Sequence, residues 1–315
     1  MQIESNAKVA HREGVVRLSD WGVIRAAGDD AATFLQGQLT QDVLSLGAGQ
    51  ARLAGYCSAK GRLSATFVLW QDMPGTLLLA CSADLLAPTL KRLQMFVLRS
   101  RCKLSDASTE ISLWGLAGTA TAQRLGGGAP PAVWAATGAG DQRRTIRLPD
   151  GDGSARYLHA APADALPPEG PTISLDEWRW LEVSSGVARI AAATAEQFVP
   201  QMVNLEVVGG VSFSKGCFPG QEVVARSQYR GTLKRRAFVL ESAVVAQPGE
   251  EVFHSADATQ PAGMVVNSAS LGERHRLFAE LKLAATTEGS LHLRAADGPA
   301  LSPPTLPYAL PGDAA

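Results

Sequence analysis

The chain has 315 residues, of which 46% are hydrophobic and 19% are charged, and its formal net charge at pH 7 is −1. This composition is typical of a globular protein with room for two or three domains. The nearly balanced charge excludes a global electrostatic attraction to nucleic acid or to an anionic membrane, so any such binding would depend on a local patch.

The sequence carries no evident targeting or membrane-spanning signal. Residues 1–8 lack the apolar stretch of a secretory signal. The most apolar run, residues 76–81, is too short to cross a bilayer. We therefore expect a cytoplasmic protein that does not engage a membrane.

The first 110 residues combine strand and helix patterns without strict alternation. Residues 14–25 alternate apolar and polar side chains and predict a strand. Asp29 or Asp30 can cap a helix that extends to Leu39. The remaining predicted elements are strands over residues 52–57, 62–70 and 76–81 and an amphipathic helix over residues 85–97. This mixture favours an α+β fold over a doubly wound parallel sheet.

The second half of the chain begins with a stretch of weak secondary-structure pattern and then becomes rich in strand patterns. Gly, Ala and Pro concentrate between residues 126 and 172, where we expect surface connections. A helix is predicted over residues 176–184, with acidic residues near its positive end. After residue 231, short strands recur at regular spacing, which is typical of a small β-barrel. The predicted strands cover residues 111–116, 144–148, 156–160, 237–240, 263–266, 276–281 and 290–293.

The segment with the clearest chemical potential surrounds Cys217. It reads Lys215-Gly216-Cys217-Phe218-Pro219-Gly220-Gln221-Glu222 and then opens a short basic helix. Pro219 suits the first turn of that helix. A thiol just before a helix and beside Lys215 is stabilised as the thiolate by two positive partners. We therefore expect Cys217 to be an exposed, reactive thiol at a tight corner that the two glycines permit.

The other cysteines, Cys57, Cys81 and Cys102, are widely spaced and form no Cys-x-x-Cys pair or His/Cys cluster. We expect them to be free thiols that pack as small apolar residues. We expect no permanent metal, because the sequence offers no recognisable ligand set.

The Cys217 segment also resembles a known family. Pro200-Gln201-Met202-Val203-Asn204-Leu205, followed by Gly210-Val211-Ser212-Phe213-Ser214 and the Cys217 segment, resembles the signature of the YgfZ-type folate-binding proteins. These are relatives of the glycine-cleavage aminomethyltransferase. Residues 18–21, 34–43, 57–62 and 306–308 resemble further parts of the family. The resemblance covers most of the chain and is weakest around residues 110–170.

The resemblance implies an aminomethyltransferase-like α+β fold, with mixed or antiparallel sheets and a small C-terminal β-barrel. It implies a folate-binding core of residues 14–110 and 172–230, a second α+β subdomain of residues 111–171 and a barrel over residues 231–315. It further implies tetrahydrofolate or a derivative as the cofactor. The implied partners are iron–sulfur enzymes or cluster-assembly proteins, with a link through such an enzyme to tRNA modification.

Two tryptophans are the implied folate contacts. Aromatic faces hold a flat pterin ring well, and Trp21 and Trp178 match tryptophans that the family places near tetrahydrofolate. Trp180 competes with Trp178 for this role. The other tryptophans are assigned to core packing, and they are Trp70, Trp114 and Trp134.

Two cationic groups complete the predicted site. Lys215 either stabilises the thiolate or contacts an anionic ligand. Arg230 belongs to a basic run that receives the glutamate tail of folate, binds RNA phosphates or is simply a solvated face. The other members of the run are Arg226, Lys234, Arg235 and Arg236. The expected catalytic residues are thus Cys217 and Lys215, and the expected cofactor contacts are Trp21, Trp178, Lys215 and Arg230.

Two features depart from the family pattern. Phe218 stands where many relatives carry Tyr, so a mechanism that needs this hydroxyl does not apply. Asp84 comes too early to match the catalytic carboxylate of the aminomethyltransferases.

The sequence favours a tetrahydrofolate-binding accessory protein that supports iron–sulfur cluster assembly or repair, with Cys217 beside a pterin-sized cavity. The alternatives are a folate-dependent aminomethyl or one-carbon transferase and a direct RNA-binding module.

Overall fold

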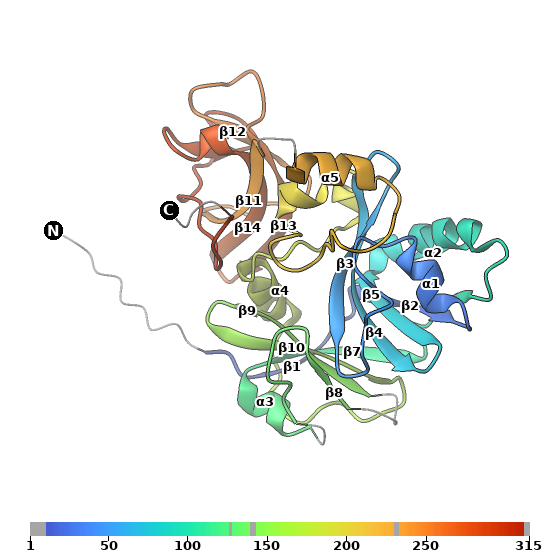
Figure 1. Ribbon diagram of the computed structural model, residues 1–315. Coiled ribbons are helices and arrows are strands. Elements are labelled where there is room, and N and C mark those ends of the chain that lie inside the picture. The colour runs from blue at the N-terminus through green and yellow to red at the C-terminus, as the bar shows by residue number, and fades with distance from the viewer. Residues whose placement is uncertain (1–10, 126–127, 139–142, 230–232, 312–315) are drawn as a thin grey trace.

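Three antiparallel sheets organise the protein. The computed structural model describes residues 11–125, 128–138, 143–229 and 233–311. Within them, each sheet has five strands, and helices lie between and around the sheets (Figure 1). This is the α+β architecture that the sequence predicts.

The first sheet has the strand order β3-β4-β5-β2-β6. Its strands are β2 (Trp21–Ala27), β3 (Ala51–Cys57), β4 (Leu63–Met73), β5 (Thr76–Ser82) and β6 (Lys103–Asp106), with helices α1 (Ala31–Gln36) and α2 (Ala83–Val97). Alternate residues of β5 pack into two different cores: Leu77 and Leu79 belong to one, and Leu78 and Ala80 to the other. Both faces of the sheet are therefore covered, which explains why the strand reads as one continuous apolar run.

The second sheet has the order β1-β7-β10-β9-β8. Its elements are β1 (Gly14–Arg17), β7 (Ile111–Ala117), β8 (Ala136–Thr137), β9 (Arg144–Gly151) and β10 (Ser154–Pro162), with the short helix α3 (Thr119–Gln123). Ile146 and Leu158 of this sheet share a core with Val68 and Trp70 of the first sheet. The two sheets therefore face each other across a common apolar layer.

The strand predicted over residues 14–25 is in fact two strands. The chain turns at Leu18, whose N–H donates to Leu113 O at 2.9 Å, and then enters the first sheet at Trp21. The alternation of side chains continues through the turn, so the pattern could not reveal that β1 and β2 belong to different sheets.

The third sheet has the order β11-β14-β13-β12-β15 and forms the C-terminal barrel. Its strands are β11 (Arg235–Ser242), β12 (Glu251–His254), β13 (Gly263–Leu271), β14 (Arg274–Lys282) and β15 (Leu291–Leu293), and a 3-10 turn, η3 (Leu283–Ala285), follows β14. Thr305 bridges to β11 and Ala300 bridges to β15. The C-terminal segment therefore connects the two edges of the sheet and curls it toward a barrel.

Helix α4 (Leu175–Ser184) lies where the three sheets meet (Figure 1). A capping box starts it: the Ser174 hydroxyl accepts from Glu177 N–H at 3.1 Å, and the Glu177 carboxylate accepts from Ser174 N–H at 2.8 Å. Trp178 on one side of the helix enters the core between the first two sheets, whereas Trp180 enters the other core. After α4 come two short 3-10 helices, η1 (Ala192–Thr194) and η2 (Pro200–Val203). Helix α5 (Gln221–Tyr229) follows them.

Helix α1 starts where expected but ends at Gln36 rather than at Leu39, and helix α5 starts later than expected. Asp30 occupies the N-cap of α1, but its carboxylate accepts from Arg101 N–H at 2.8 Å rather than from the helix. Helix α5 starts at Gln221, so Pro219 lies before it and not in its first turn. The reason is Gly220, whose φ of +76° breaks the helical path. In the part of the chain that the structure describes, no helix is long and apolar enough to span a membrane.

Candidate functional site

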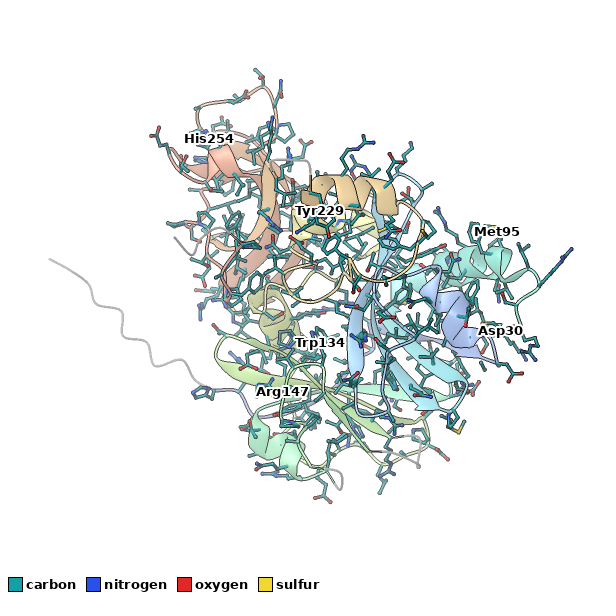
Figure 2. The ribbon with its side chains drawn as sticks, in the orientation of Figure 1. Asp30, Met95, Trp134, Arg147, Tyr229 and His254 are labelled. Carbon is teal, nitrogen blue, oxygen red and sulfur yellow. The ribbon has the colours of Figure 1, made fainter. Side chains whose placement is uncertain are left out.

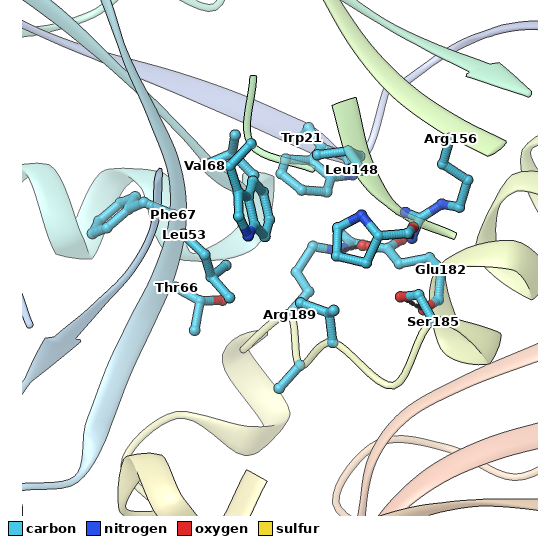
Figure 3. A pocket seen from close by; sticks show the side chains of 14 residues that line it. Trp21, Leu53, Thr66, Phe67, Val68, Leu148, Arg156, Glu182, Ser185 and Arg189 are labelled. Atoms are coloured by element: carbon cyan, nitrogen blue, oxygen red, sulfur yellow. Dashed lines mark hydrogen bonds and ion pairs between the residues drawn. The ribbon is translucent and has the colours of Figure 1, made fainter. Parts of the chain in front are cut away.

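A cavity of about 410 Å³, counting its open mouth, lies between the first two sheets and the end of α4. Of this volume, the part that a water-sized sphere can enter is about 30 Å³. Arg156, Glu182 and Ser185 lie on one side of it, and Phe67 and Val68 lie on the other (Figure 3). The lining residues are Trp21, Leu53, Thr66, Phe67, Val68, Trp134, Leu148, Pro149, Arg156, Glu182, Ser185, Val187, Ala188 and Arg189.

Two indole rings contribute to the walls of the cavity. Trp21 stands at the start of β2, and the Arg189 guanidinium lies 5.0 Å from the centre of its ring. Trp134 lies between the first and second sheets (Figure 2) and donates from Nε1 to Val208 O at 3.4 Å. The cavity therefore has aromatic faces suited to a flat ring.

The charged groups of the cavity centre on Arg189. Its Nε lies 2.9 Å from Glu182 Oε1, and its Nη2 donates to Asp20 Oδ2 at 3.0 Å. Burial alone would lower the pKa of Arg189, but Glu182 and Asp20 raise it above its ordinary value. Burial likewise acts to raise the pKa of Asp20, and Arg189 with Arg179 holds it below its ordinary value. Arg189 and Asp20 are therefore both ionised at neutral pH.

Arg156 is the second guanidinium that lines the cavity. The residue is 3% exposed, and burial lowers its pKa to about 10 despite the nearby Glu182. Its guanidinium lies 4.7 Å from the centre of the Trp178 ring. Trp178 therefore forms the floor beneath Arg156 and is not itself one of the lining residues. Gly115 makes room for it, because a Cβ there would come within 2.6 Å of the indole.

Several polar atoms in and around the cavity have no hydrogen-bond partner among the described residues. They are Asp20 Oδ1, Trp21 Nε1, Arg156 Nε and Trp178 Nε1. A buried polar atom without a partner costs about 1–3 kcal/mol. Two of them, Trp21 Nε1 and Arg156 Nε, belong to residues that line the cavity, where a polar ligand or ordered water can satisfy them.

Trp180, the competing candidate, faces away from this cavity. Its Nε1 donates to Asp152 Oδ2 at 2.9 Å, and Arg276 lies 4.1 Å from the centre of its ring. The indole N–H is therefore satisfied within the protein. Trp180 thus joins α4 to the C-terminal barrel and to the β9–β10 turn.

Cys217 is exposed, as the sequence predicts, while Cys57, Cys81 and Cys102 are buried. Burial raises the pKa values of Cys57 and Cys81 to about 12, so these thiols stay protonated. Lys215 is only 9% exposed and donates from Nζ to the carbonyls of Gln36 and Leu39. The lysine therefore points into the protein, next to a thiol that faces solvent.

Neither Cys217 nor Lys215 is among the described residues that line the cavity. Strand β3 links the Cys217 loop to the cavity. Leu39, which accepts from Lys215, bridges to Tyr56 on this strand, and Leu53 on the same strand lines the cavity. The lining thus gives no support to the prediction that the thiol stands beside the cavity.

The basic run is largely neutralised where the structure describes it. Arg235 pairs with Glu280 at 2.6 Å, and Arg236 pairs with the buried Glu206 at 2.5 Å. Arg226 pairs with Glu222 at 2.7 Å on the surface of α5. The predicted ligand contact Arg230 lies outside the described residues. The paired arginines do not form a free cationic face for phosphates.

Sequence reasoning missed four residues of the cavity: Trp134, Arg156, Glu182 and Arg189. Trp134 was assigned to core packing, yet it lines the cavity. The available signal was weak: Glu182 lies one helical turn after Trp178, and Arg189 interrupts an apolar stretch. Asp84 does not line this cavity, and its carboxylate accepts from Ala192 N–H at 2.9 Å.

Comparison with solved structures defines the class of fold. The chain is similar to the glycine cleavage system aminomethyltransferase T of Bartonella henselae, with a TM-score of 0.67 and 17% sequence identity, over 95% of this chain and 87% of that one. The protein therefore has the aminomethyltransferase-like fold that the sequence predicts.

Sequence comparison narrows this class to one family. No family model matches the chain. The chain is 34% identical over 248 residues to the tRNA-modifying protein YgfZ of Edwardsiella ictaluri, covering 74% of this chain and 72% of the relative. It is 30% identical over 311 residues to the protein of that name from Serratia proteamaculans, covering 94% and 92%. The chain belongs to the YgfZ family of tRNA-modifying proteins.

Proposed function

We propose that this protein binds tetrahydrofolate, or a derivative, in the cavity between its first two sheets and acts as an accessory factor for iron–sulfur enzymes. Through such an enzyme it supports tRNA modification. The observation that carries the folate part is a cavity with two tryptophans in which Trp21 Nε1 and Arg156 Nε have no hydrogen-bond partner among the described residues. Family membership and the exposed thiol support the accessory role.

The chemistry of the cavity matches that of a pterin. A pterin is flat, and its pyrimidine edge offers an amino group and a ring N–H as adjacent donors. Glu182 supplies a carboxylate for such a pair of donors, and charge-assisted hydrogen bonds of this kind are the strong ones. Trp21 and Trp134 supply aromatic faces. Arg156 has an unpartnered Nε that can be satisfied by an acceptor on the ligand or by water.

Cys217 is the proposed reactive group. An exposed thiolate can ligate iron transiently or exchange with a partner thiol. A single thiolate is far from the ligand set of a permanent cluster. The thiol faces solvent, where a macromolecular partner can reach it.

A folate-dependent one-carbon transferase remains the alternative function, and Glu182 is the observation that favours it. This carboxylate lines the cavity and could hold or move a proton at the folate. However, the ion pair with Arg189 restrains it, and Asp84 lies outside the cavity. Product formation from 5,10-methylenetetrahydrofolate and an amine acceptor by the purified protein, lost in Glu182→Gln, would establish the transferase instead.

Calorimetric titration with tetrahydrofolate tests the folate part. Trp21→Ala and Glu182→Gln should each weaken binding about tenfold, because each removes about 1–2 kcal/mol of ligand contact. Trp114→Ala is the matched control: this tryptophan packs on Arg17 and does not line the cavity. Equal affinity in wild type and both cavity variants would refute the assignment.

Complementation tests the role of the thiol. In cells that lack the endogenous protein, Cys217→Ala should fail to restore the modified tRNA, although its affinity for tetrahydrofolate stays within twofold of wild type. Ser214→Ala, a change in the same exposed loop, is the control and should complement. Full complementation by Cys217→Ala would remove the thiol from the proposal.

A further inference from the structure

The end of helix α2 exposes a group of large apolar side chains. Met95, Phe96 and Leu98 are 62%, 47% and 87% exposed, and all three fall within four consecutive residues. The other large apolar residues that the structure shows as exposed stand singly along the chain. A single exposed apolar residue is normal, whereas several together are typical of an interaction site.

The backbone at Leu98 gives a second and independent sign of function. Helix α2 ends at Val97, and Leu98 follows it with a φ of +42° and a ψ of −104°. A bulky residue rarely takes a positive φ, and glycine is the usual residue just after a helix. The chain therefore accepts backbone strain where it exposes a leucine, and such strain is concentrated at functional sites.

Cations flank these apolar side chains in the sequence. Three of them are exposed and form no ion pair with any residue that the structure describes: Lys91, Arg99 and Lys103. Arg101 differs, because it pairs with Asp29 at 3.0 Å and with Asp30. We call the three apolar residues and the three unpaired cations the α2 patch. Its chemistry complements a surface with an apolar hollow and an acidic rim.

Helix α1 relates the α2 patch to the thiol. The Asp30 carboxylate at the start of α1 accepts from Arg101 N–H at 2.8 Å, just after the patch in the chain. At the other end of α1, the Gln36 carbonyl accepts from Lys215 in the Cys217 loop. The helix has six residues and is thus about 9 Å long. A protein interface of ordinary size is roughly 30 Å across, so one partner can cover the patch and reach the thiol.

We propose that the α2 patch is the docking surface for an acidic protein with an apolar hollow, and that this protein is the partner that Cys217 serves. The inference rests on the function proposed for the thiol and adds the chemistry of its partner. The patch lies at the outer edge of the molecule, where Figure 2 labels Met95. A lipid surface fits less well, because the buried leucines of α2 face the core and only its last turn offers apolar side chains.

The variant Leu98→Gly tests this inference, because it removes the exposed side chain and also relieves the positive φ. The binding partner in the test is the purified iron–sulfur enzyme that makes the tRNA modification measured by complementation. Leu98→Gly should bind this enzyme at least fivefold more weakly than wild type in a calorimetric titration, and should restore less of the modified tRNA in cells.

Three further measurements separate docking from a structural role. The temperature of the unfolding midpoint of Leu98→Gly should be no lower than that of wild type. Its affinity for tetrahydrofolate and the rate at which iodoacetamide alkylates Cys217 should each stay within twofold of wild type. Arg99→Glu should also weaken binding of the enzyme, and this effect should shrink as salt is added, since salt screens exposed charges.

Leu166→Gly is the matched control. Leu166 is also 87% exposed, but it lies in the segment after β10 of the second sheet. This variant should bind the enzyme and complement as wild type does.

Four results would overturn the inference. The first is wild-type protein that does not bind the enzyme, and the second is a Leu98→Gly variant that binds and complements as wild type does. The third is an equal loss in Leu166→Gly. The fourth is sedimentation of wild type, but not of Leu98→Gly, with phosphatidylglycerol vesicles, which would assign the patch to a lipid surface.

The failure of this inference is distinguishable from the failure of the proposed function. If Leu98→Gly complements and Cys217→Ala does not, the role of the thiol stands and the docking surface is refuted. If Cys217→Ala complements and Leu98→Gly does not, the patch still docks a partner, but the thiol does not serve it.

Discussion

The cavity and the thiol loop each contain a buried cation, and the two cations are neutralised in different ways. Arg189 in the cavity has two carboxylate partners, Glu182 and Asp20, and its pKa is raised. Lys215 in the loop has backbone carbonyls as its hydrogen-bond acceptors, and its pKa is lowered to about 8. Carboxylates carry a full charge, whereas carbonyl dipoles compensate burial only in part.

This difference separates a permanent charge from one that responds to pH. Arg189 and Asp20 stay ionised throughout the physiological range and can orient a polar ligand. Lys215 loses its proton near the upper end of that range. The cavity therefore holds a permanent charge, whereas the buried charge of the loop responds to pH.

The largest expected effect concerns the floor of the cavity. Trp178→Ala should lower the free energy of unfolding by about 3–5 kcal/mol, because it leaves a void in a core where the side chain is fully buried. Urea denaturation measures this loss. Trp114→Ala, at a partly exposed tryptophan, should cost less. A loss below 1 kcal/mol for Trp178→Ala would mean that the region is not rigidly packed.

The next largest loss of stability is expected when Arg189 is removed from its ion pairs with Glu182 and Asp20. Arg189→Met should destabilise the protein by about 3 kcal/mol, because it leaves Glu182 and Asp20 without their buried partner. Arg179→Met is the control, since Arg179 also pairs with Asp20 but is 38% exposed, and it should cost less than about 1 kcal/mol. Similar losses in the two variants would remove the contrast between buried and surface charges.

The pH dependence of stability tests whether the pKa of Lys215 in the loop is lowered by burial. The pKa of Lys215 is lowered from 10.5 to about 8, so between these pH values the unfolded chain holds a proton that the folded chain has lost. Stability from this group therefore rises as pH increases from 8 to 10.5. The unfolding free energy of wild type, relative to that of Lys215→Met, should rise by up to about 3 kcal/mol over this range. A difference that stays constant, or that shrinks as pH rises, would contradict the lowered pKa.

The smallest effect is expected on the surface of α5. Glu222 and Arg226 form an exposed pair, with side chains 84% and 68% exposed. Glu222→Gln should change the free energy of unfolding by less than about 0.5 kcal/mol. A loss above 1 kcal/mol would show that this pair contributes more than solvent-screened surface charges do.

Much of the fold could be predicted from local patterns. The strands β3, β4 and β5 and the helix α2 appear where periodicity places them. The break between β1 and β2 could not be predicted, because it depends on which sheet each strand joins. That choice is made by long-range pairing with β7 and β5, which leaves no mark on the alternation of side chains.

The candidate site was only partly predictable, for a related reason. Trp21 and the exposed thiol were found because each stands in a recognisable segment. Arg156, Glu182 and Arg189 come from β10, α4 and the segment after α4, and only the packing of three elements brings them together. The burial of Lys215 was equally invisible, since its partners are backbone carbonyls and any sequence supplies those.

The proposed function depends most on a tetrahydrofolate-binding cavity that is separate from the thiol loop. A crystal structure of the protein with tetrahydrofolate tests this directly. We predict a pterin ring against Trp21, with its amino edge toward Glu182 and Cys217 out of contact with the ligand. A pterin bound against Cys217, or on the surface of another sheet, would contradict the account.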